Sequence, residues 1–441
     1  MNKITQSELV FESTKGKKVT ADFQGGTITS DAGLLLLRSL SKQIGLIDNA
    51  ARSLKDRRHS SYVDHTIKDL LTQRIMQIAS GYYHSLDCNR MRDDVALKVA
   101  CDKSHGESLS SQSTMSRLEN SLSRTDLYRL SLTICNQFTA SYKKPPKRII
   151  LDIDDTCDPT HGAQQLSIFN AFDDTYCYRP LHIYEGKTGK LVTAVLRPGK
   201  RPSGTETSSI LQRVIKEIRS RWPKVKILIR GDSHFGNEAV MNLCESFNNV
   251  EYVLCVAKNK VLARLCEEGF SLQRGYQTHE DFRHYEAFDY AANSWSKKRR
   301  VIARIEVKGE SEDVRYIVTN VKGRTARYLY EKIYCGRCQA ENWIKDHKNS
   351  LRSDLTSCHQ FSANYFRLLL HSMAYILLHE FRTRALKNTK LASAQMDTIR
   401  LRILKVGARV VEKSKVIRFH LPDVLSGDSM FKKAYRNLFG T

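Results

Sequence analysis

The stretch that decides the fold is a short apolar segment, Arg148-Ile149-Ile150-Leu151-Asp152-Ile153-Asp154. Its run of Ile and Leu predicts a buried β-strand. Just before it, Pro145 and Pro146 end any helix, because proline lacks the N–H that a helix interior needs, and so they mark a linker. The chain therefore changes character near residue 146, where a mostly helical segment gives way to strands.

Strands and helices alternate after this point. We predict further strands at 176–184, 191–196, 225–230 and 252–257, and helices at 205–221 and 237–247. The first three strands form a meander, because the turn at 185–190 is a hairpin connection. The order of a meander followed by helix, strand, helix and strand predicts an α/β fold with a mixed sheet and helices packed on it.

The remaining sequence has a different texture. Residues 258–327 are β-rich, with alternating apolar and polar positions, and we interpret them as an insertion rather than as a continuation of the core. Helices resume near residue 328 and continue to about 385. From Leu378 onward the chain carries 14 Lys and Arg against 5 Asp and Glu, and residues 399–421 alternate like a basic hairpin.

The charge of the chain narrows its function. Lys and Arg number 71 and Asp and Glu 47, a net charge of +24 in 441 residues. A protein that neutralises phosphates needs such an excess, because each Lys or Arg contact releases counterions from nucleic acid. The alternatives are a basic protein kept soluble by its charge and a protein that binds acidic proteins or lipids.

Three features of the sequence argue against a membrane or secreted protein. The longest apolar helix-like run, 366–381, contains Arg367 and Glu380 and falls short of the ~20 apolar residues that a bilayer requires. The N-terminus shows no apolar signal core. The 11 cysteines are scattered and odd in number, which does not suggest a disulfide framework. We therefore expect a reducing, cytoplasmic location.

Several acids stand at the end of the deciding strand. Asp152 and Asp154 are two residues apart, so both side chains point to the same face, and Asp155 and Asp158 follow. Acids on a buried strand are costly unless a cation neutralises them, and Mg²⁺ takes carboxylate oxygens readily. This cluster predicts a divalent metal site, the alternative being an ordinary Asp-rich turn.

Two further acids complete a possible catalytic set. Asp232 stands at the carboxyl end of a strand, where ligands collect in open α/β sheets, although it could also cap the next helix. Glu341 belongs to a set with Tyr334, Arg337 and Lys348, at helical offsets of 0, 3, 7 and 14 that predict one helix face, or alternatively a solvated amphipathic helix. Two metals bridged by carboxylates promote in-line displacement at a phosphodiester.

These residues resemble the bacterial DDE transposases that carry the YREK signature, and in particular the insertion-sequence family named "thirteen-eighty". The order Asp154, Asp232, Tyr334-x2-Arg337-x3-Glu341-x6-Lys348 carries the resemblance. Matching segments also occur at 29–33, 116–120, 151–162, 196–199, 230–235 and 357–364, so the resemblance covers nearly the whole chain. One departure is Cys338, which stands where the family commonly has Gly.

The resemblance implies an RNase H-like mixed β-sheet core. It assigns residues 1–145 to a helical N-terminal region that binds DNA ends, 146–257 to the first part of the core, 258–327 to the β-rich insertion, 328–385 to completion of the core with the helix of Glu341, and 386–441 to a basic C-terminal region.

The implied reaction is cut-and-paste transposition, in which hydrolysis at the ends of the element is followed by attack of the freed 3′-hydroxyl on target DNA. Asp154, Asp232 and Glu341 would be the catalytic acids and hold two Mg²⁺ or Mn²⁺ ions, with Asp152 assisting. A hairpin intermediate is common in this group. The implied partners are double-stranded terminal repeats, target DNA and a second copy of the chain, in the nucleoid of a bacterial cytoplasm.

Candidate DNA contacts follow from the same resemblance. Tyr334, Arg337 and Lys348 would hold phosphates or a flipped base near the cut. Arg197 and Lys200 are further candidates. Arg117 follows a Ser-rich stretch that suits either a helix laid against DNA or a helix cap.

Other interpretations stay open at this point. The chain could be a catalytically silent DNA-binding regulator, or an RNase H-like nuclease without strand transfer. Cys335, Cys338 and the pair Cys358-His359 have a spacing near that of a zinc ribbon. His161 and His234 could relay protons or contact phosphate or be structural, and Trp295 could stack on a base or anchor a loop.

Overall fold

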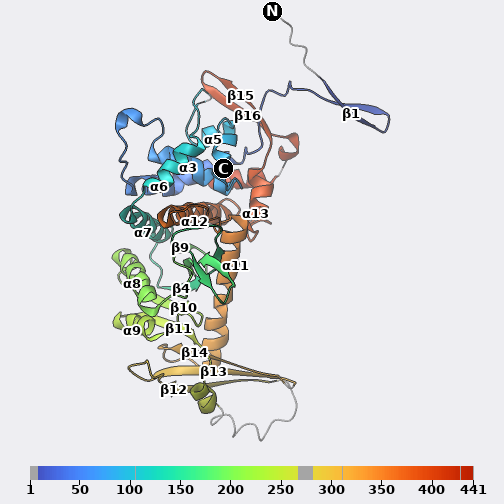
Figure 1. Ribbon diagram of the computed structural model, residues 1–441. Helices are drawn as coiled ribbons and strands as arrows, with labels where there is room; N and C mark the ends of the chain where they lie inside the picture. The colour runs from blue at the N-terminus through green and yellow to red at the C-terminus, as the bar shows by residue number, and fades with distance from the viewer. Residues whose placement is uncertain (1–7, 105, 267–281, 310, 428, 441) are drawn as a thin grey trace, which may run out of the picture. The chain divides into compact units, whose positions relative to one another are not determined.

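The computed structural model describes residues 8–104, 106–266, 282–309, 311–427 and 429–440 (Figure 1). The chain forms two compact units. Unit 1 comprises Met1–Ala51, Asp56–Leu118 and Leu377–Thr441, and unit 2 comprises Arg52–Lys55 and Glu119–Ile376. All three predicted catalytic acids lie in unit 2.

Unit 2 is built on an eight-stranded sheet with the order β12-β13-β14-β11-β10-β4-β8-β9. Its strands are β4 (Arg148–Asp155), β8 (Leu181–Glu185), β9 (Leu191–Val195), β10 (Lys226–Gly231), β11 (Val250–Val256), β12 (Phe282–Tyr290), β13 (Arg299–Lys308) and β14 (Ser311–Thr319). β10 runs parallel to β4 and β11, whereas the other pairs are antiparallel. The predicted α/β class with a mixed sheet is confirmed.

Strand β4 is buried on both faces of the sheet. Because successive side chains point to opposite faces, they pack into two different hydrophobic cores. The first core receives Ile149, Leu151 and Ile153. Ile150 belongs to the second core, and Asp152 and Asp154 share its side of the strand. Each fully buried Ile or Leu contributes roughly 1.5–3 kcal/mol, so β4 is fixed firmly between the two layers.

Helices cover both faces of this sheet. The first core is closed by α7 (Arg124–Ala140), α8 (Gly204–Arg221) and α9 (Glu238–Ser246), which supply Phe138, Leu211 and Val240 among others. The second core is closed by Leu329 and Tyr330 from a helical run that begins at Tyr328. Figure 1 shows α8 and α9 on one side of the strands and the run that includes α11 on the other.

The helical run is less regular than predicted. It consists of a wide π turn η2 (Tyr328–Tyr334), a tight 3-10 turn η3 (Cys335–Cys338), the α-helix α11 (Gln339–Lys345) and a second wide π turn η4 (Asp346–Ser350). Offsets of 0, 3, 7 and 14 share a face only at a constant 3.6 residues per turn. The run therefore aims its four signature side chains differently from a straight α-helix.

The β-rich segment does not form a separate layer. β14 pairs with β11 along Val253↔Thr319 to Val256↔Tyr316, so β12–β14 extend the core sheet, in contrast to the predicted insertion apart from it. The reason is visible in the alternation of β13, whose Val301, Ala303 and Ile305 continue the first core.

A small three-stranded sheet lies directly after β4. It contains β5 (Asp158–Pro159), β6 (Ile168–Asn170) and β7 (Thr175–Tyr178), with β7 in the middle. β5 follows the acid-bearing end of β4 after only two residues. The short connection therefore keeps the small sheet close to the end of the predicted catalytic strand.

Unit 1 contains both helices and strands. The strands are β1 (Leu9–Thr14), β2 (Lys17–Ala21), β3 (Thr27–Thr29), β15 (Ala408–Lys413) and β16 (Val416–His420). Its helices include α1 (Leu34–Ile44), α3 (Ile67–Ala79), α5 (Val95–Ala100), α13 (Met396–Ile399) and α14 (Met430–Phe439). Three helices have residues in both units: α2 (Leu46–Ser53), α6 (Gln112–Ser121) and α12 (Phe361–Arg384). The segment predicted as helical thus opens with three strands, and the predicted C-terminal hairpin begins at Ala408, after the turn η5 (Arg400–Leu404).

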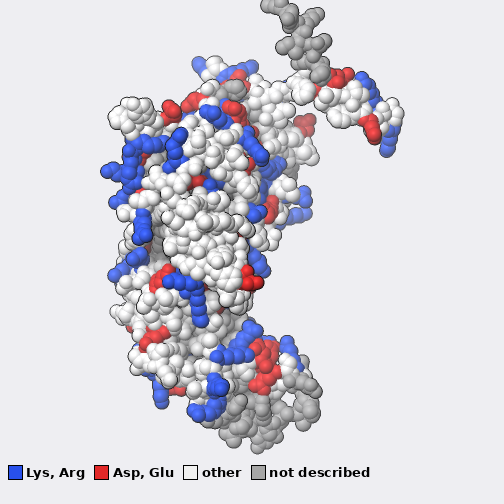
Figure 2. All heavy atoms as spheres, viewed as in Figure 1, with Lys and Arg blue, Asp and Glu red and all other residues white. Residues whose placement is uncertain are grey.

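Charge is spread widely over the surface. Lys and Arg side chains lie across the face shown in Figure 2, interrupted by small groups of Asp and Glu. Among the described residues, no helix combines the length and the apolar character that crossing a membrane requires.

Candidate active site

The candidate site begins with a bridge made by Arg337. Its Nη1 lies 2.9 Å from Oδ2 of Asp154 on β4, and its Nη2 lies 3.7 Å from Oε1 of Glu341 on α11. The tight turn η3 carries Arg337 and places its guanidinium between these two acids. The first and third predicted catalytic acids, 187 positions apart in the sequence, therefore face one cation.

Asp232 joins them through strand register. β10 pairs with β4 along Arg230↔Asp152 and Gly231↔Ile153, so the next residue, Asp232, follows at the same edge as Asp154. Burial raises the pKa of Asp154 to about 7, the charge of Arg337 opposes this rise, and the charges of Asp232 and Asp155 add to it. Asp154, Asp155 and Asp232 are therefore close enough to repel one another. The positive charge of Arg337 does not fully offset the burial of Asp154 and this repulsion.

Glu341 stands at the rim. Its side chain is 54% exposed, whereas that of Asp154 is 11% exposed. Glu341 occupies the first turn of α11 and has room to turn toward the other two acids. Two of these carboxylates follow adjacent parallel strands and the third stands on α11. Carboxylate oxygens are ligands that Mg²⁺ and Mn²⁺ accept, but among the described residues Asp154, Asp232 and Glu341 do not form one group of ligand atoms within 4.8 Å of one another.

Lys348, on η4, contacts the segment that follows β4. Its Nζ is 3.3 Å from Oδ1 of Asp158 and 3.1 Å from Oγ1 of Thr156, and it also donates to the backbone carbonyl of Cys157. Burial raises the pKa of Asp158 to about 7, and Lys348 opposes that rise. The Lys348 ammonium is thus held beside the end of the acid-bearing strand.

Comparison with known proteins now decides the family. The sequence model described as transposase DDE domain group 1 matches residues 11–440. The chain belongs to this family of DDE transposases.

Two further comparisons complete the picture. A cryo-EM structure described as the piggyBac transposase synaptic complex with hairpin DNA is similar to this chain at 14% identity, with a TM-score of 0.42, and the match covers 85% of this chain and 80% of that one. Comparison with curated proteins finds no match.

In this DDE transposase Asp152 does not face the other acids. Both of its oxygens accept hydrogen bonds of 2.6 Å from Arg230, and the Asp152 side chain is fully buried. Arg230 thus occupies both oxygens of Asp152, and the assistance of Asp152 in metal binding stays a prediction. Sequence reasoning missed Arg230, although its position just before Gly231-Asp232 was a usable signal.

The pair of Arg230 and Asp152 also fixes the helical run. Nη1 of Arg230 donates to the carbonyl of Ile333 at 2.6 Å. A Cβ added at Gly336 would come within 2.6 Å of the same nitrogen, so only glycine allows this approach. Arg230 thereby joins β4, β10 and the turn that carries Arg337.

Asp155 has partners of its own. Its Oδ1 lies 2.7 Å from Nδ1 of His234, and its Oδ2 lies 2.6 Å from Nε of Arg179. Burial alone would raise the pKa of Asp155, but the hydrogen bonds from His234 and Arg179 lower it. A nitrogen of His234 and oxygens of Asp155 and Asp232 also lie within 4.8 Å of one another, so His234 borders the acid cluster.

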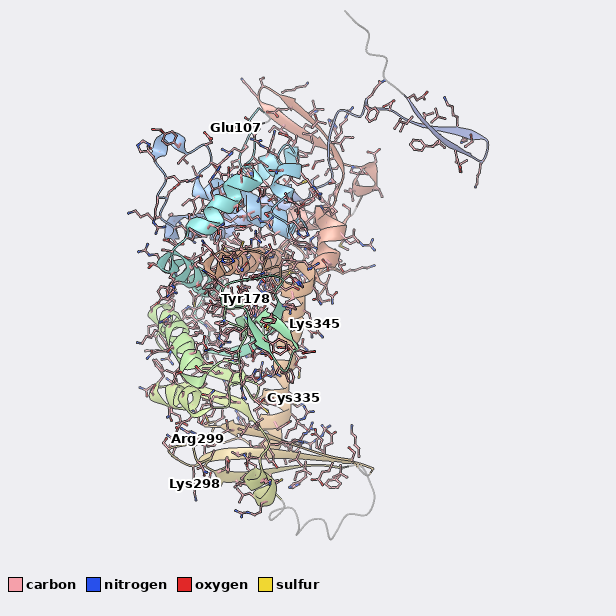
Figure 3. All side chains as sticks on the ribbon, viewed as in Figure 1. Glu107, Tyr178, Lys298, Arg299, Cys335 and Lys345 are labelled. Carbon is pink, nitrogen blue, oxygen red and sulfur yellow. The ribbon has the colours of Figure 1, made fainter. Side chains whose placement is uncertain are left out.

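Tyr334 is half-buried on the second core. Its ring lies 5.4 Å from that of Tyr330, centroid to centroid, and burial raises the pKa of its hydroxyl. Figure 3 marks Cys335, the next residue, on the helical run. Tyr334 thus packs against the second core, on the same helical run as Arg337, and its DNA contact stays a prediction.

The remaining predicted DNA contacts differ in exposure. The side chain of Arg197 is 1% exposed and pairs with Glu206 at 2.6 Å, and its DNA contact stays a prediction. Lys200 is exposed. Arg117 on α6 is exposed and donates to Oγ1 of Thr114 at 3.1 Å. Lys200 and Arg117 therefore stay predictions.

The structure also shows the surroundings of the other residues that the sequence singled out. Trp295 packs on Tyr290 and Arg299 and anchors its loop, and Figure 3 marks Arg299 at the start of β13. Cys335 and Cys338 are exposed, and among the described residues they belong to no group of three close metal-binding side chains. His161 is exposed beside the small sheet.

Proposed function

We propose that this chain catalyses metal-dependent cut-and-paste DNA transposition, with Asp154, Asp232 and Glu341 as the catalytic acids. The observation that carries the proposal is the placement of Arg337, which pairs with Asp154 and lies next to Glu341 at the edge where Asp232 follows β10. These contacts support one site built by three acids from three separate elements, which metal-assisted phosphodiester chemistry would require.

The finer assignments rest on the sequence resemblance together with the fold. The strand order β9-β8-β4-β10-β11, an antiparallel meander followed by two parallel strands, supports an RNase H-like core. Tyr334, Arg337, Glu341 and Lys348 keep the spacing of the YREK signature and support membership of the "thirteen-eighty" group. The natural substrates would be the ends of the element and target DNA, bound by two copies of the chain.

When bound, two Mg²⁺ or Mn²⁺ ions would activate the attacking water or 3′-hydroxyl and stabilise the leaving oxygen. The chain's own residues supply the rest. Arg337 neutralises Asp154 in this structure, and it becomes free to contact a backbone phosphate once another cation neutralises that carboxylate. Lys348 adds a second positive charge beside the end of β4.

The test uses DNA taken from both sides of the reading frame, incubated with purified protein, Mg²⁺ and a target plasmid. Asp154→Ala and Glu341→Ala are the test variants. Glu331→Ala is the matched control, because Glu331 lies on the same helical run but pairs with Tyr285 and Arg327. Cuts at matching inverted repeats and joined products, lost in both test variants and kept in the control, would support the proposal.

The other outcomes separate the alternatives. Specific binding of the ends without any cut would favour a silent regulator. Cuts without joined products would favour a nuclease. Cleavage by Glu341→Ala at the wild-type rate would remove Glu341 from the catalytic set.

A further inference from the structure

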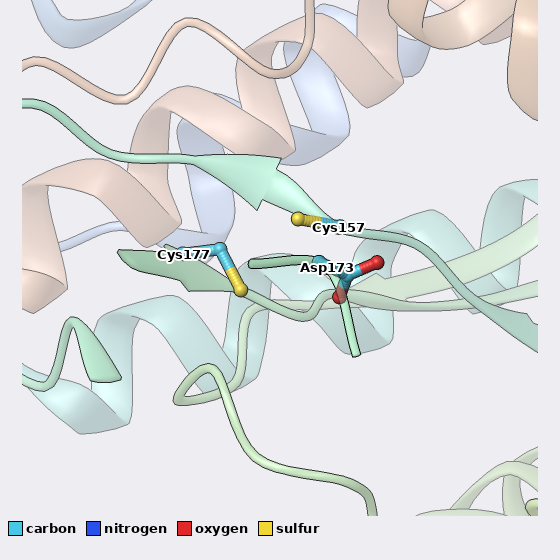
Figure 4. Close-up of side chains that lie close together, drawn as sticks. All are labelled: Cys157, Asp173 and Cys177. Carbon is cyan, nitrogen blue, oxygen red and sulfur yellow. The ribbon is translucent and has the colours of Figure 1, made fainter. Parts of the chain in front are cut away.

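A second cluster of metal-binding side chains lies outside the three acids. Sulfur atoms of Cys157 and Cys177 and a carboxylate oxygen of Asp173 all lie within 4.8 Å of one another. Cys157 stands between β4 and β5, Asp173 in the turn between β6 and β7, and Cys177 on β7. Figure 4 shows the three side chains around one small region of the structure.

We propose that Cys157, Cys177 and Asp173 form a binding site for a thiophilic divalent metal, with Zn²⁺ the best fit. Two thiolates and a carboxylate supply three ligands, and a water molecule can complete the tetrahedron that zinc prefers. Thiolate ligands select zinc over Mg²⁺, which prefers the all-oxygen set of Asp154, Asp232 and Glu341. The two sites therefore take different ions.

The charge around the cluster permits this ion. Burial and the neighbouring Cys177 raise the pKa of Cys157 to about 12, and burial raises the pKa of Cys177, so both are thiols when no metal is present. Binding one Zn²⁺ releases one proton from each thiol to the solvent, so the local charge does not change. The nearby cations Lys348 and Arg179 are then no obstacle.

Asp173 has a ligand oxygen to spare. One oxygen of Asp173 pairs with Nη1 of Arg179, whose Nε binds Asp155 at 2.6 Å. A carboxylate has two oxygens, so it can bind a guanidinium through one and a metal through the other. The guanidinium of Arg179 would hold the Asp173 carboxylate in place while its other oxygen binds the ion, as hydrogen-bonded carboxylates do in metal centres.

The position of the cluster suggests what the ion does. A metal held by Cys157 and Cys177 pins the segment after β4 to β7. That segment supplies Thr156 and the Cys157 carbonyl, which accept hydrogen bonds from Lys348. The ion would therefore be structural, fixing the place where Lys348 is held.

The test measures metal rather than DNA cleavage, so it does not depend on the proposed function. Purified full-length protein is loaded with Zn²⁺ alone, desalted and analysed for zinc by mass spectrometry. Replacement by Co²⁺ gives a thiolate-to-cobalt absorption band that reports sulfur ligands directly. We expect one zinc per chain and a cobalt–thiolate band in the wild type.

Three variants and one matched control locate the ion. Cys157→Ser, Cys177→Ser and Asp173→Asn should each weaken zinc binding by about 100-fold. The double change Cys335→Ser with Cys338→Ser is the control, because these exposed cysteines offer the competing CxxC site. Cys157 and Asp173 are only partly buried, so their variants keep the test valid if Cys177→Ser fails to fold.

Several results would overturn the proposal. One is a wild-type chain that retains no zinc, and another is zinc lost from the CxxC control but kept in Cys157→Ser. A third is a disulfide between Cys157 and Cys177 in freshly purified protein, seen as two missing thiols in the denatured, unreduced chain.

Discussion

The acid Asp154 offers a direct physical test of the candidate site. Its pKa of about 7 in the folded chain, against an ordinary value of 3.8, means that ionising it costs the folded state about 4 kcal/mol. Between about pH 4 and pH 7 the folded chain holds a proton that the unfolded chain has released. This contribution to stability is fully present below pH 4 and is lost as the pH rises toward 7, by about 1.4 kcal/mol per pH unit.

The perturbation is Asp154→Asn, which removes the titration but keeps the shape. Relative to wild type, the variant should gain about 2 kcal/mol of stability as the pH rises from 5 to 7 and gain little more above 7. Asn keeps a carbonyl oxygen that can accept the hydrogen bond from Arg337, so any constant offset between variant and wild type reflects only the exchange of a neutral acid for an amide. The change with pH, rather than the offset, is therefore the diagnostic quantity.

The assay is denaturant unfolding in EDTA at pH 5, 6, 7 and 8, followed by tryptophan fluorescence. All three tryptophans, Trp222, Trp295 and Trp343, lie in unit 2, so the signal reports the unit that holds the site. Adding Mg²⁺ should stabilise the wild type most at high pH and leave Asp154→Asn nearly unchanged, because ligand binding stabilises only the form that binds it.

Glu245→Gln is the matched control. Burial alone would raise the pKa of Glu245, but hydrogen bonds from Arg299, Lys297 and Tyr252 lower it to about 2. Its stabilising contribution is lost only as the pH falls below the ordinary value of 4.5, so the variant should lose a constant amount of stability from pH 5 to 8. A difference between Asp154→Asn and wild type that is equally constant over this range would refute the reasoning.

Three further predictions follow from the site and the surface. Arg230→Met should destabilise unit 2 by about 3–5 kcal/mol because it leaves Asp152 buried without its partner, whereas Arg148→Met at a half-exposed pair should cost less than about 1 kcal/mol; equal losses in urea unfolding would contradict this. Cleavage should require Mg²⁺ or Mn²⁺ while Ca²⁺ supports binding only, and cleavage in excess EDTA would exclude the metal mechanism. The affinity for the DNA ends should fall steeply as the salt concentration rises. In a mobility-shift titration, the slope of log K against log salt should correspond to contacts with several phosphates, and a flat dependence would argue against an extended basic surface.

The sequence predicted the strands of the sheet more completely than it predicted the partners of the side chains on them. The Ile and Leu pattern of β4 and the spacing of the following strands were enough for the mixed α/β core, because burial of apolar residues dominates strand formation. The same pattern could not show that β12–β14 would join the core sheet. That outcome depends on pairing between β11 and β14, which are distant in the sequence.

The acids show where sequence reasoning stops. Asp152 and Asp154 lie two residues apart on the same face of one strand, and only Thr156, two residues after Asp154, favoured Asp154 as the catalytic acid. Arg230, which comes from a neighbouring strand, takes both oxygens of Asp152 and leaves Asp154 to Arg337. Likewise, the family resemblance named Arg197 as a candidate DNA contact, but it could not show that the side chain is buried in a pair with Glu206.

The two arginines also explain how one strand can carry both a fixed and a responsive acid. The pair of Arg230 and Asp152 is almost completely buried, and Arg230 donates to Ile333 as well, so it cannot exchange partners without breaking three hydrogen bonds. Arg337 makes a single hydrogen bond with Asp154 and lies farther from the exposed Glu341. Because Arg230 donates to Ile333 in η2, just before the turn η3 that carries Arg337, the buried pair of Arg230 and Asp152 holds this part of the helical run in place independently of Arg337.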